Sequence, residues 1–303
     1  MENVLVSGGC GFIGSAVVEQ LLKNNKNVII LRKSDKPLSR IRENKIDGAR
    51  RISIDLANSE ELLLSGIQID TCYHFAWDGI SGEALSDIDR QYRNIRYCYN
   101  LQKTVARMGC KRFIGAGSIG QLELKHEKCL AGRERYYKCA KDACEDFCRT
   151  NADELGIDFI WPLITNSYGV GEESNRFVNY MIKELLREND LPVSEGKQFY
   201  DFVYIDDVAK AFYLIGEYGH TGKRYIVGSG EAKRHREWIE PVPGYLQSEG
   251  RLQFGKYASA DIFLEKKDFD ILELVQDTGY QPKVSFEEGI KKTAEYMIEN
   301  GIS

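Results

Sequence analysis

The sequence has little of what marks a nucleic-acid or membrane protein. Lys and Arg total 41 and Asp and Glu total 46 among 303 residues, so the formal net charge is -5. We find no run of like charges longer than a few residues, and no apolar run near the roughly 18 residues of a membrane span. We therefore expect neither a nucleic-acid nor a membrane partner, and a small neutral or anionic molecule as the ligand.

The chain also lacks metal-ligand spacings. It has four histidines, and its eight cysteines all lie in the first half, outside any C-x-x-C motif. Cys144 and Cys148 are one helical turn apart, but no histidine pair joins them, so we predict no metal site. Cysteines at apolar positions are typical of reduced thiols, and no basic segment precedes the first apolar run. These features predict a cytoplasmic protein.

What the first half does have is an alternation of short β-branched runs with longer amphipathic segments. This pattern is typical of βαβ units on a parallel sheet, and it predicts an α/β fold with a Rossmann-type doubly wound sheet. The predicted strands are 3–7, 27–31, 51–55, 71–76, 112–118 and 158–164. The predicted helices between them include 15–24, 87–109 and 141–156.

Four glycines stand in the stretch SGGCGFIG, from Ser7 to Gly14. Gly9, Gly11 and Gly14 read G-x-G-x-x-G, whereas Gly8, Gly11 and Gly14 read G-x-x-G-x-x-G. A strand precedes the glycines and a helix follows them, which is the context of a dinucleotide-binding loop. Glycines let backbone N–H groups approach a pyrophosphate at the positive end of the helix. The loop predicts a dinucleotide cofactor.

Basic residues follow the second predicted strand. Arg32, Lys33 and Ser34 come directly after it, and no acid appears before Asp35. An acid there would bind the ribose 2′-hydroxyl of NAD, whereas an arginine suits the 2′-phosphate of NADP. We therefore expect NADP(H) to be favoured over NAD(H). Asp55, after the third strand, is a candidate for the adenine edge or for a helix N-cap.

Two Tyr-x-x-x-Lys pairs are candidates for acid–base chemistry. Tyr99 with Lys103 and Tyr137 with Lys141 each place a phenol and an ammonium on one helical face. The second pair follows the fifth strand, where active residues of such sheets gather, and Ser118 ends that strand. We predict that Tyr137 and Lys141 act with Ser118, and that the first pair lies on a helix surface.

Over nearly its whole length the chain resembles the extended short-chain dehydrogenase/reductase group, also described as the NAD-dependent epimerase/dehydratase family. SGGCGFIG is similar to the family's TGGxGFIG loop, which favours Gly8, Gly11 and Gly14 as the spacing. The other matching motifs are YHFAW, RNIRYCYNL, GAGS, YYKCAK, NSYGVG and YDFVYIDDVAKA, in the family's order.

The resemblance implies a Ser-Tyr-Lys mechanism for ketone/alcohol interconversion. Tyr137 would be the acid or base, Lys141 would lower the pKa of the phenol and hold the nicotinamide ribose, and Ser118 would hydrogen-bond the reacting oxygen. The implied cofactor-binding residues are Gly8, Gly11, Phe12, Ile13, Gly14, Arg32, Asp55, Leu56, Phe75, Ala76, Trp77, Tyr137 and Lys141.

NSYGVG and YDFVYIDDVA look most like family members that act on nucleotide-activated sugars. By that resemblance Ser118 and Asn166 meet the substrate, and Asn175 and Arg176 lie near its phosphates. Two departures concern arginines that normally hold the diphosphate: Tyr200 replaces one, and YASAD at 257–261 replaces the element with the other. Phosphate recognition is then left to Arg176 or to the other arginines of this region, Arg234, Arg236 and Arg251.

The resemblance leaves the reaction open among several types. Trp77 and the following DGISGE resemble ketosugar reductases of the abequose and paratose type, and Arg32 also favours a 4-keto reductase. A nucleotide-sugar 4-epimerase or dehydratase is the alternative, and a non-catalytic NADP-sensing binding protein is a further one. The family also resembles dimers built from two helices, here about 87–109 and 135–154, so a homodimer is expected.

The second half has a looser rhythm, with helices predicted at 177–189 and 206–218 around a strand near 201–205. We expect residues 1–165 to form the dinucleotide-binding domain, to which 199–216 return. Residues 166–198 and 217–303 are expected to form a smaller substrate-binding lobe, with the ligand site in the cleft between them.

Overall fold

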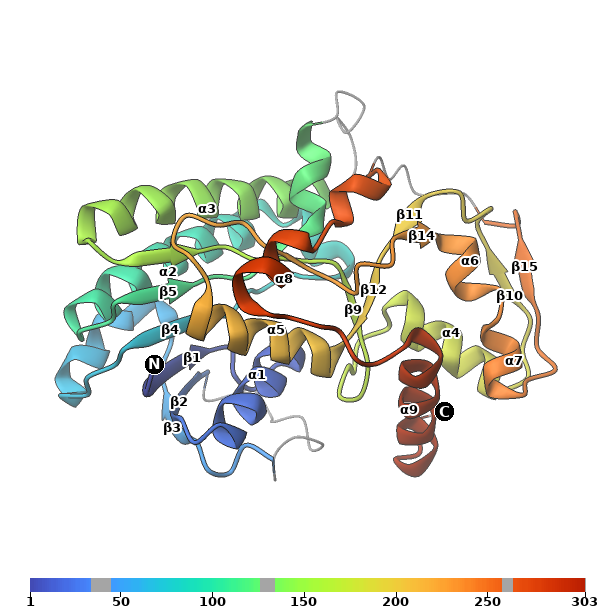
Figure 1. The fold of residues 1–303 in the computed structure, drawn as a ribbon, viewed down its shortest axis with the longest axis horizontal. Helices are drawn as coiled ribbons and strands as arrows, with labels where there is room; N and C mark the ends of the chain where they lie inside the picture. The colour runs from blue at the N-terminus through green and yellow to red at the C-terminus, as the bar shows by residue number, and fades with distance from the viewer. Residues whose placement is uncertain (34–44, 126–133, 258–263, 303) are drawn as a thin grey trace.

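A computed structural model describes residues 1–33, 45–125, 134–257 and 264–302 (Figure 1). Ser34, Asp35 and residues 258–261 of the YASAD segment lie outside the described residues. None of the helices in the described ranges is both long and apolar enough to cross a membrane.

Six parallel strands form the central sheet, which confirms the predicted α/β fold with a doubly wound sheet. Their order is β3-β2-β1-β4-β5-β7. β2 and β3 therefore lie on one side of β1, and β4, β5 and β7 lie on the other side. This reversal beside β1 is where ligands of such sheets bind. The strands are β1 (Asn3–Ser7), β2 (Asn27–Arg32), β3 (Arg50–Ser53), β4 (Thr71–His74), β5 (Arg112–Ile114) and β7 (Asp158–Ile160).

Two of the predicted strands are broken in the structure. The segment 112–118 splits into β5 and β6 (Gly117–Ser118), and 158–164 splits into β7 and β8 (Leu163–Ile164). Pro162 has no N–H to donate to a ladder. The ring of Trp161 packs against Gly115, which lies between β5 and β6, and a Cβ on Gly115 would lie 2.1 Å from that ring. β6 and β8 join β13 (Ile226–Val227) in a separate sheet of order β13-β8-β6.

Helices cover both faces of the sheet (Figure 1). On one face α1 (Phe12–Lys23) packs against α5 (Ile205–Tyr218), and on the other α2 (Ile88–Arg107) packs against α3 (Glu134–Leu155). Each face has its own cluster of buried apolar side chains. The short 3-10 segments are η1 (Leu56–Ser65), η2 (Gly82–Ser86), η3 (Ile119–Lys125) and η4 (Lys266–Phe269).

Smaller elements of the second half gather at one end of the sheet. β9 pairs with β12 and β10 with β15, both in parallel, while β11 and β14 are antiparallel. Two elements from 217–303 contact earlier parts of the chain, since β13 pairs with β8 and α8 packs on α5. The elements are β9 (Asn166–Tyr168), α4 (Phe177–Leu186), β10 (Leu191–Val193), β11 (Phe199–Tyr200), β12 (Phe202–Tyr204), β14 (Lys233–Arg234), α6 (His235–Ile239), α7 (Val242–Leu246), β15 (Leu252–Phe254), α8 (Leu272–Thr278) and α9 (Phe286–Glu299).

Two buried aspartates in YDFVYIDDVAKA join distant loops. The Asp201 carboxylate accepts hydrogen bonds from the backbone N–H groups of Ser229 and Gly230, at 3.0 and 3.1 Å. The Asp207 carboxylate accepts from the N–H groups of residues 283 and 284, at 3.0 and 2.9 Å. Backbone donors of this kind compensate a carboxylate for lost water. The motif therefore has a structural use that is separate from catalysis.

The packing of α5 on the sheet predicts a cost for one small substitution. A Cβ on Gly216 would lie 1.8 Å from the hydroxyl of buried Tyr73. Alanine favours a helix over glycine by about 1 kcal/mol, but overpacking typically costs about 1–3 kcal/mol. We expect Gly216→Ala to lower the free energy of unfolding measured in urea. The matched control is Gly244→Ala in α7, where no atom lies within 4 Å of the added Cβ; equal stability of the two variants would contradict this packing.

Candidate active site

The glycine loop connects β1 to α1, and its glycines have different surroundings. Gly8 has φ +72°, and a Cβ there would lie 2.5 Å from the backbone nitrogen of Ala76. A Cβ on Gly14 would lie 2.2 Å from the Gly8 carbonyl oxygen, and one on Gly9 would lie 3.0 Å from Ile30. Gly8 and Gly14 thus allow three backbone segments to meet. Gly11 is exposed, and its Cβ would meet only the Gly8 oxygen, at 3.4 Å.

The start of α1 offers backbone donors to an anion. Gly11 is the N-cap and has no capping side chain, and its carbonyl accepts from the N–H of Ser15 at 2.9 Å. The N–H groups of Phe12, Ile13 and Gly14 have no acceptor within the helix, because no helical turn precedes them. These N–H groups carry the partial positive charge of the helix N-terminus, and they lie beside Gly11, which is exposed to solvent. This loop fits the pyrophosphate of a dinucleotide.

Other predicted cofactor residues lie at the same edge of the sheet. Arg32 ends β2, and its carbonyl accepts from the N–H of Ile54 at 2.9 Å. Asp55 caps η1 by accepting from the N–H of Ala57 at 2.9 Å, which is the competing use considered for it. Phe75, Ala76 and Trp77 follow β4, and Leu56 begins η1. The carboxyl ends of four parallel strands therefore bring these residues together.

Ser118 ends β6 and lies in a tight turn that a buried glutamine organises. The side-chain oxygen of Gln121 accepts from the backbone N–H of Ser118 at 3.0 Å and from the indole of Trp161 at 3.1 Å. The Ser118 hydroxyl accepts from the N–H of Gly120 at 3.3 Å. Gln121 is 1% exposed and was not among the predicted site residues. Nothing in its sequence neighbourhood marks it, because its partners Glu145 and Trp161 come from two other segments.

Tyr137 lies in the first turn of α3, and Ser118 hydrogen-bonds its phenol. Burial raises the pKa of Tyr137 above its usual value, while the positive charge of Arg176 and the bond from Ser118 oppose this shift. The phenol therefore keeps its proton at neutral pH. The structure brings together three of the predicted side chains: Ser118, Tyr137 and Arg176.

Lys141 follows one turn later, on the same face of α3, and is 5% exposed. Its ammonium donates to the carbonyl of Ala116 at 2.6 Å and lies 6.0 Å from the ring centre of Tyr137. Burial lowers the pKa of Lys141 to about 8, and the nearby Cys144 and Cys98 oppose this shift. Below that pH the ammonium is protonated. The expected lowering of the phenol pKa does not result, because burial outweighs the opposing interactions and raises the pKa of Tyr137.

Trp77 makes the closest aromatic contact with that ammonium. The Lys141 nitrogen lies 3.7 Å from the indole centre, and the indole meets the Tyr137 ring edge-on at 6.3 Å. The indole N–H donates to Gln91 on α2 at 2.9 Å. Asn94, one turn further, bonds both the backbone N–H and the carbonyl of Asp78. Buried polar residues of α2 therefore hold the loop that carries Trp77.

Three of the predicted substrate residues come from the second half of the chain. Asn166 is in β9, and exposed Asn175 and Arg176 precede α4. Arg176 pairs with Glu172 at 3.8 Å, and its charge acts on Tyr137. Tyr200, which stands where the family commonly has an arginine, packs against the ring of His235 at 4.6 Å and carries no charge to offer a phosphate.

The other arginines considered for phosphate binding have local contacts of their own. Arg236 pairs with Glu240 at 2.9 Å and lies 4.2 Å from the ring centre of Phe254. Arg234 lies 4.1 Å from the ring centre of Phe199 and bonds the carbonyl of residue 197. Arg236 and Arg251 line a groove of about 450 Å³ beside α7. Of these arginines, Arg176 is the one whose charge acts on Tyr137.

The alternative pair, Tyr99 and Lys103, lies in α2. The Lys103 nitrogen is 5.5 Å from the ring centre of Tyr99, which is half-buried, and Lys103 is exposed. Among the described residues, no hydrogen bond, ion pair or ring contact links this pair to Ser118 or to the glycine loop.

The fold agrees with comparisons to known proteins. Residues 4–228 match the model of the NAD dependent epimerase/dehydratase family. The chain is 24% identical to the CDP-abequose synthase of Salmonella muenchen, over 99% of this chain and 96% of that protein. It is also 24% identical to a dTDP-glucose 4,6-dehydratase of Haemophilus influenzae, over the full length of both.

Among solved structures, the fold is similar to that of UDP-N-acetylglucosamine 4-epimerase from Methanobrevibacter ruminantium M1 in complex with UDP-N-acetylmuramic acid. The TM-score is 0.82 at 21% identity, and the match covers 99% of each chain.

The contact between Trp77 and Lys141 predicts a pKa change. The indole face stabilises the charged form of a desolvated ammonium by about 2 kcal/mol, and about 1.4 kcal/mol corresponds to one pKa unit. We expect Trp77→Leu to lower the pKa of Lys141 from about 8 by about one unit. The measurement is the pH dependence of the lysine Cε chemical shift in ¹³C-lysine-labelled protein.

Trp77→Phe is the matched control, because it keeps a ring face and loses the indole N–H. Its pKa for Lys141 should lie between those of the native protein and Trp77→Leu. An unchanged or raised pKa in Trp77→Leu would show that the indole contributes nothing to the charge of Lys141.

Proposed function

The chain belongs to the NAD-dependent epimerase/dehydratase family, and on that basis we propose that it is an NADPH-dependent reductase of a nucleotide-activated 4-ketosugar. The observation that carries the proposal is the phenol of Tyr137, which keeps its proton at neutral pH and whose ring centre lies 6.0 Å from the Lys141 ammonium. A ketone needs a proton at its oxygen when it is reduced. The neutral phenol of Tyr137 can donate such a proton.

The chain's own residues divide the work in the following way. Tyr137 donates its phenolic proton to the carbonyl oxygen, and Ser118 donates a hydrogen bond to the same oxygen. The ammonium of Lys141 stabilises the phenolate that remains, since its pKa of about 8 keeps it protonated at neutral pH. NADPH, when bound at the glycine loop, would supply the hydride to the carbonyl carbon.

The turn after Ser118 favours a reductase over a dehydratase. Elimination of water requires an acid for the departing hydroxyl and a base for the proton on carbon. Ile119 and Gly120 follow Ser118 and supply neither group. Glu123, the next carboxylate in this segment, is 4% exposed and pairs with Lys138 at 2.5 Å. This ion pair neutralises the charge of the Glu123 carboxylate, so Glu123 is poorly suited to act as an acid or a base. This supports the proposal that Tyr137 is the proton donor and acts alone.

We also propose that Arg176 holds the substrate diphosphate. It is exposed at the start of α4, and its charge acts on the phenol of Tyr137. A sugar nucleotide that reaches from Tyr137 to Arg176 would present its phosphates to a guanidinium, which binds them in a bidentate manner. Because Tyr200 stands where the family commonly has an arginine, the binding of the diphosphate would depend more on Arg176.

A homodimer through α2 and α3 is part of the proposal. Both helices keep large exposed aromatic side chains after packing on the sheet and on each other. Tyr92 on α2 is 66% exposed, and Tyr136 and Phe147 on α3 are 49% and 59% exposed. Exposed apolar groups on paired helices support an interface between two copies.

The Tyr137 assignment predicts loss of turnover without loss of cofactor binding. With NADPH and a panel of CDP-, dTDP-, GDP- and UDP-4-ketosugars, the native protein should consume NADPH with at least one of them. Tyr137→Phe should slow this reaction at least about a hundredfold, because a positioned acid contributes about 10²–10⁴ in rate. Titration of Trp fluorescence should show unchanged NADPH affinity.

Tyr136→Phe is the matched control, since the same atom is removed from the neighbouring residue and the rate should not change. Dehydration or epimerisation of a nucleotide sugar without net NADPH consumption would contradict the reductase. NADPH binding with no turnover on any sugar would instead indicate a binding protein.

Arg32 predicts the choice between the two dinucleotides. If its guanidinium meets the 2′-phosphate, Arg32→Gln should weaken NADPH binding at least about tenfold, in line with the 1.5–3 kcal/mol of a hydrogen bond to a charged group. NADH binding should change little. Arg51→Gln on the neighbouring strand β3 is the control and should leave both affinities unchanged. Equal affinity of the native protein for NADH and NADPH would remove Arg32 from this role.

A further inference from the structure

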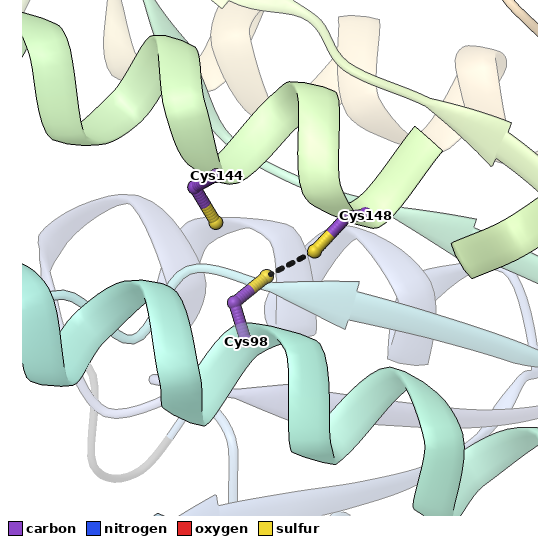
Figure 2. A group of neighbouring side chains, drawn as sticks. All are labelled: Cys98, Cys144 and Cys148. Carbon is purple, nitrogen blue, oxygen red and sulfur yellow. Dashed lines mark hydrogen bonds between the residues drawn. The ribbon is translucent and has the colours of Figure 1, made fainter. Parts of the chain in front are cut away.

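Three cysteine thiols converge between α2 and α3 (Figure 2). Cys98 comes from α2, and Cys144 and Cys148 come from successive turns of α3. All three sulfur atoms lie within 4.8 Å of one another, and the sulfurs of Cys98 and Cys148 are 3.5 Å apart. The expectation of no metal site considered Cys144 and Cys148, and the third thiol reaches them from a different helix.

The surroundings hold these thiols in place. Each of the three side chains is 0% exposed. The amide of Gln102 on α2 donates to the carbonyl of Cys148 at 3.0 Å, and Asn151 on α3 donates to Gln102 at 2.6 Å. These buried hydrogen bonds link the two helices on the side where the sulfurs meet. The positions of the thiols are therefore set before any ligand arrives.

We propose that Cys98, Cys144 and Cys148 form a binding site for one cuprous ion, Cu(I). A metal–sulfur distance of about 2.3 Å places three sulfurs of a planar trigonal site about 4 Å apart. Cys98 and Cys148 have their sulfurs 3.5 Å apart, and all three sulfurs lie within 4.8 Å of one another, which is compatible with such a site. Cu(I) is a soft ion that thiolates select.

The number of ligands separates Cu(I) from zinc. Structural zinc sites are almost always tetrahedral with four protein ligands. Within the ranges that the structure describes, no further Cys, His, Asp or Glu joins this group of three. Full burial also leaves no solvent beside the thiols to complete a tetrahedron. A trigonal site of three sulfurs suits an ion that accepts three ligands.

Charge balance points to a partner for the bound ion. Three thiols that bind one Cu(I) release three protons and leave a complex with a net charge of -2. The Lys141 ammonium lies one helical turn before Cys144 on α3, and its charge interacts with those of Cys144 and Cys98. It offsets part of the negative charge without being a ligand. The metal site and the proposed catalytic lysine are thus electrostatically linked.

Anaerobic titration with Cu(I) in competition with a chromophoric chelator tests the site directly and needs no enzyme activity. We expect one tightly bound Cu(I) per chain. Cys98→Ser, Cys144→Ser and Cys148→Ser should each weaken this binding more than the 10 to 100-fold typical for loss of an outer-shell partner. Cys139→Ser, which changes an exposed thiol on the same helix, is the matched control and should leave it unchanged.

X-ray absorption of the Cu(I)-loaded native protein decides the coordination even where a serine variant fails to fold. Three sulfur neighbours at about 2.3 Å are expected. Two sulfurs, or a tightly bound ion that persists in a folded Cys144→Ser variant, would overturn the proposal. Zn(II) binding that displaces Cu(I) at equal concentration would also overturn it, because it would require a fourth ligand.

Discussion

The buried ammonium of Lys141 is the constraint on which the rest of the site depends. A charged side chain that is 5% exposed costs stability unless polar groups replace its lost water. The carbonyl of Ala116 and the face of Trp77 do this, and they come from the segment between β5 and β6 and from the loop after β4. One side chain therefore joins α3, the sheet edge and the Trp77 loop. The position of Tyr137 one turn earlier follows from that anchoring.

The parallel sheet gives this anchoring its place. Because the carboxyl ends of β1, β2, β3 and β4 lie at one edge, the glycine loop, Arg32, Asp55 and Trp77 meet there although they are far apart in sequence. Buried carboxylates join loops that are far apart in the sequence, of which Asp201 bonds the backbone at Ser229 and Gly230.

Much of the fold could be predicted because strand and helix periodicities are local properties. β1 has the predicted bounds, and α2 differs from its prediction by a residue or two. The prediction of a single strand over 158–164 was wrong, because Pro162 has no N–H to donate and the strand is interrupted there. The apolar residues on either side of Pro162 form a continuous hydrophobic run, so the hydrophobicity pattern does not reveal the interruption. Gln121 was missed because a buried glutamine has no periodic signal, and its role depends on Trp161, 40 residues away.

The sequence by itself determined the order of the elements, the glycine loop and the Tyr-x-x-x-Lys pair, because each depends on spacing within one strand, turn or helix. Only the tertiary structure decided which side chains share a site. The contact of Trp77 with Lys141, the action of Arg176 on Tyr137, and the approach of Cys98 to Cys148 each join separate elements. The physical reason is that burial and electrostatic interaction depend on distance in space, which helix packing sets and chain separation does not.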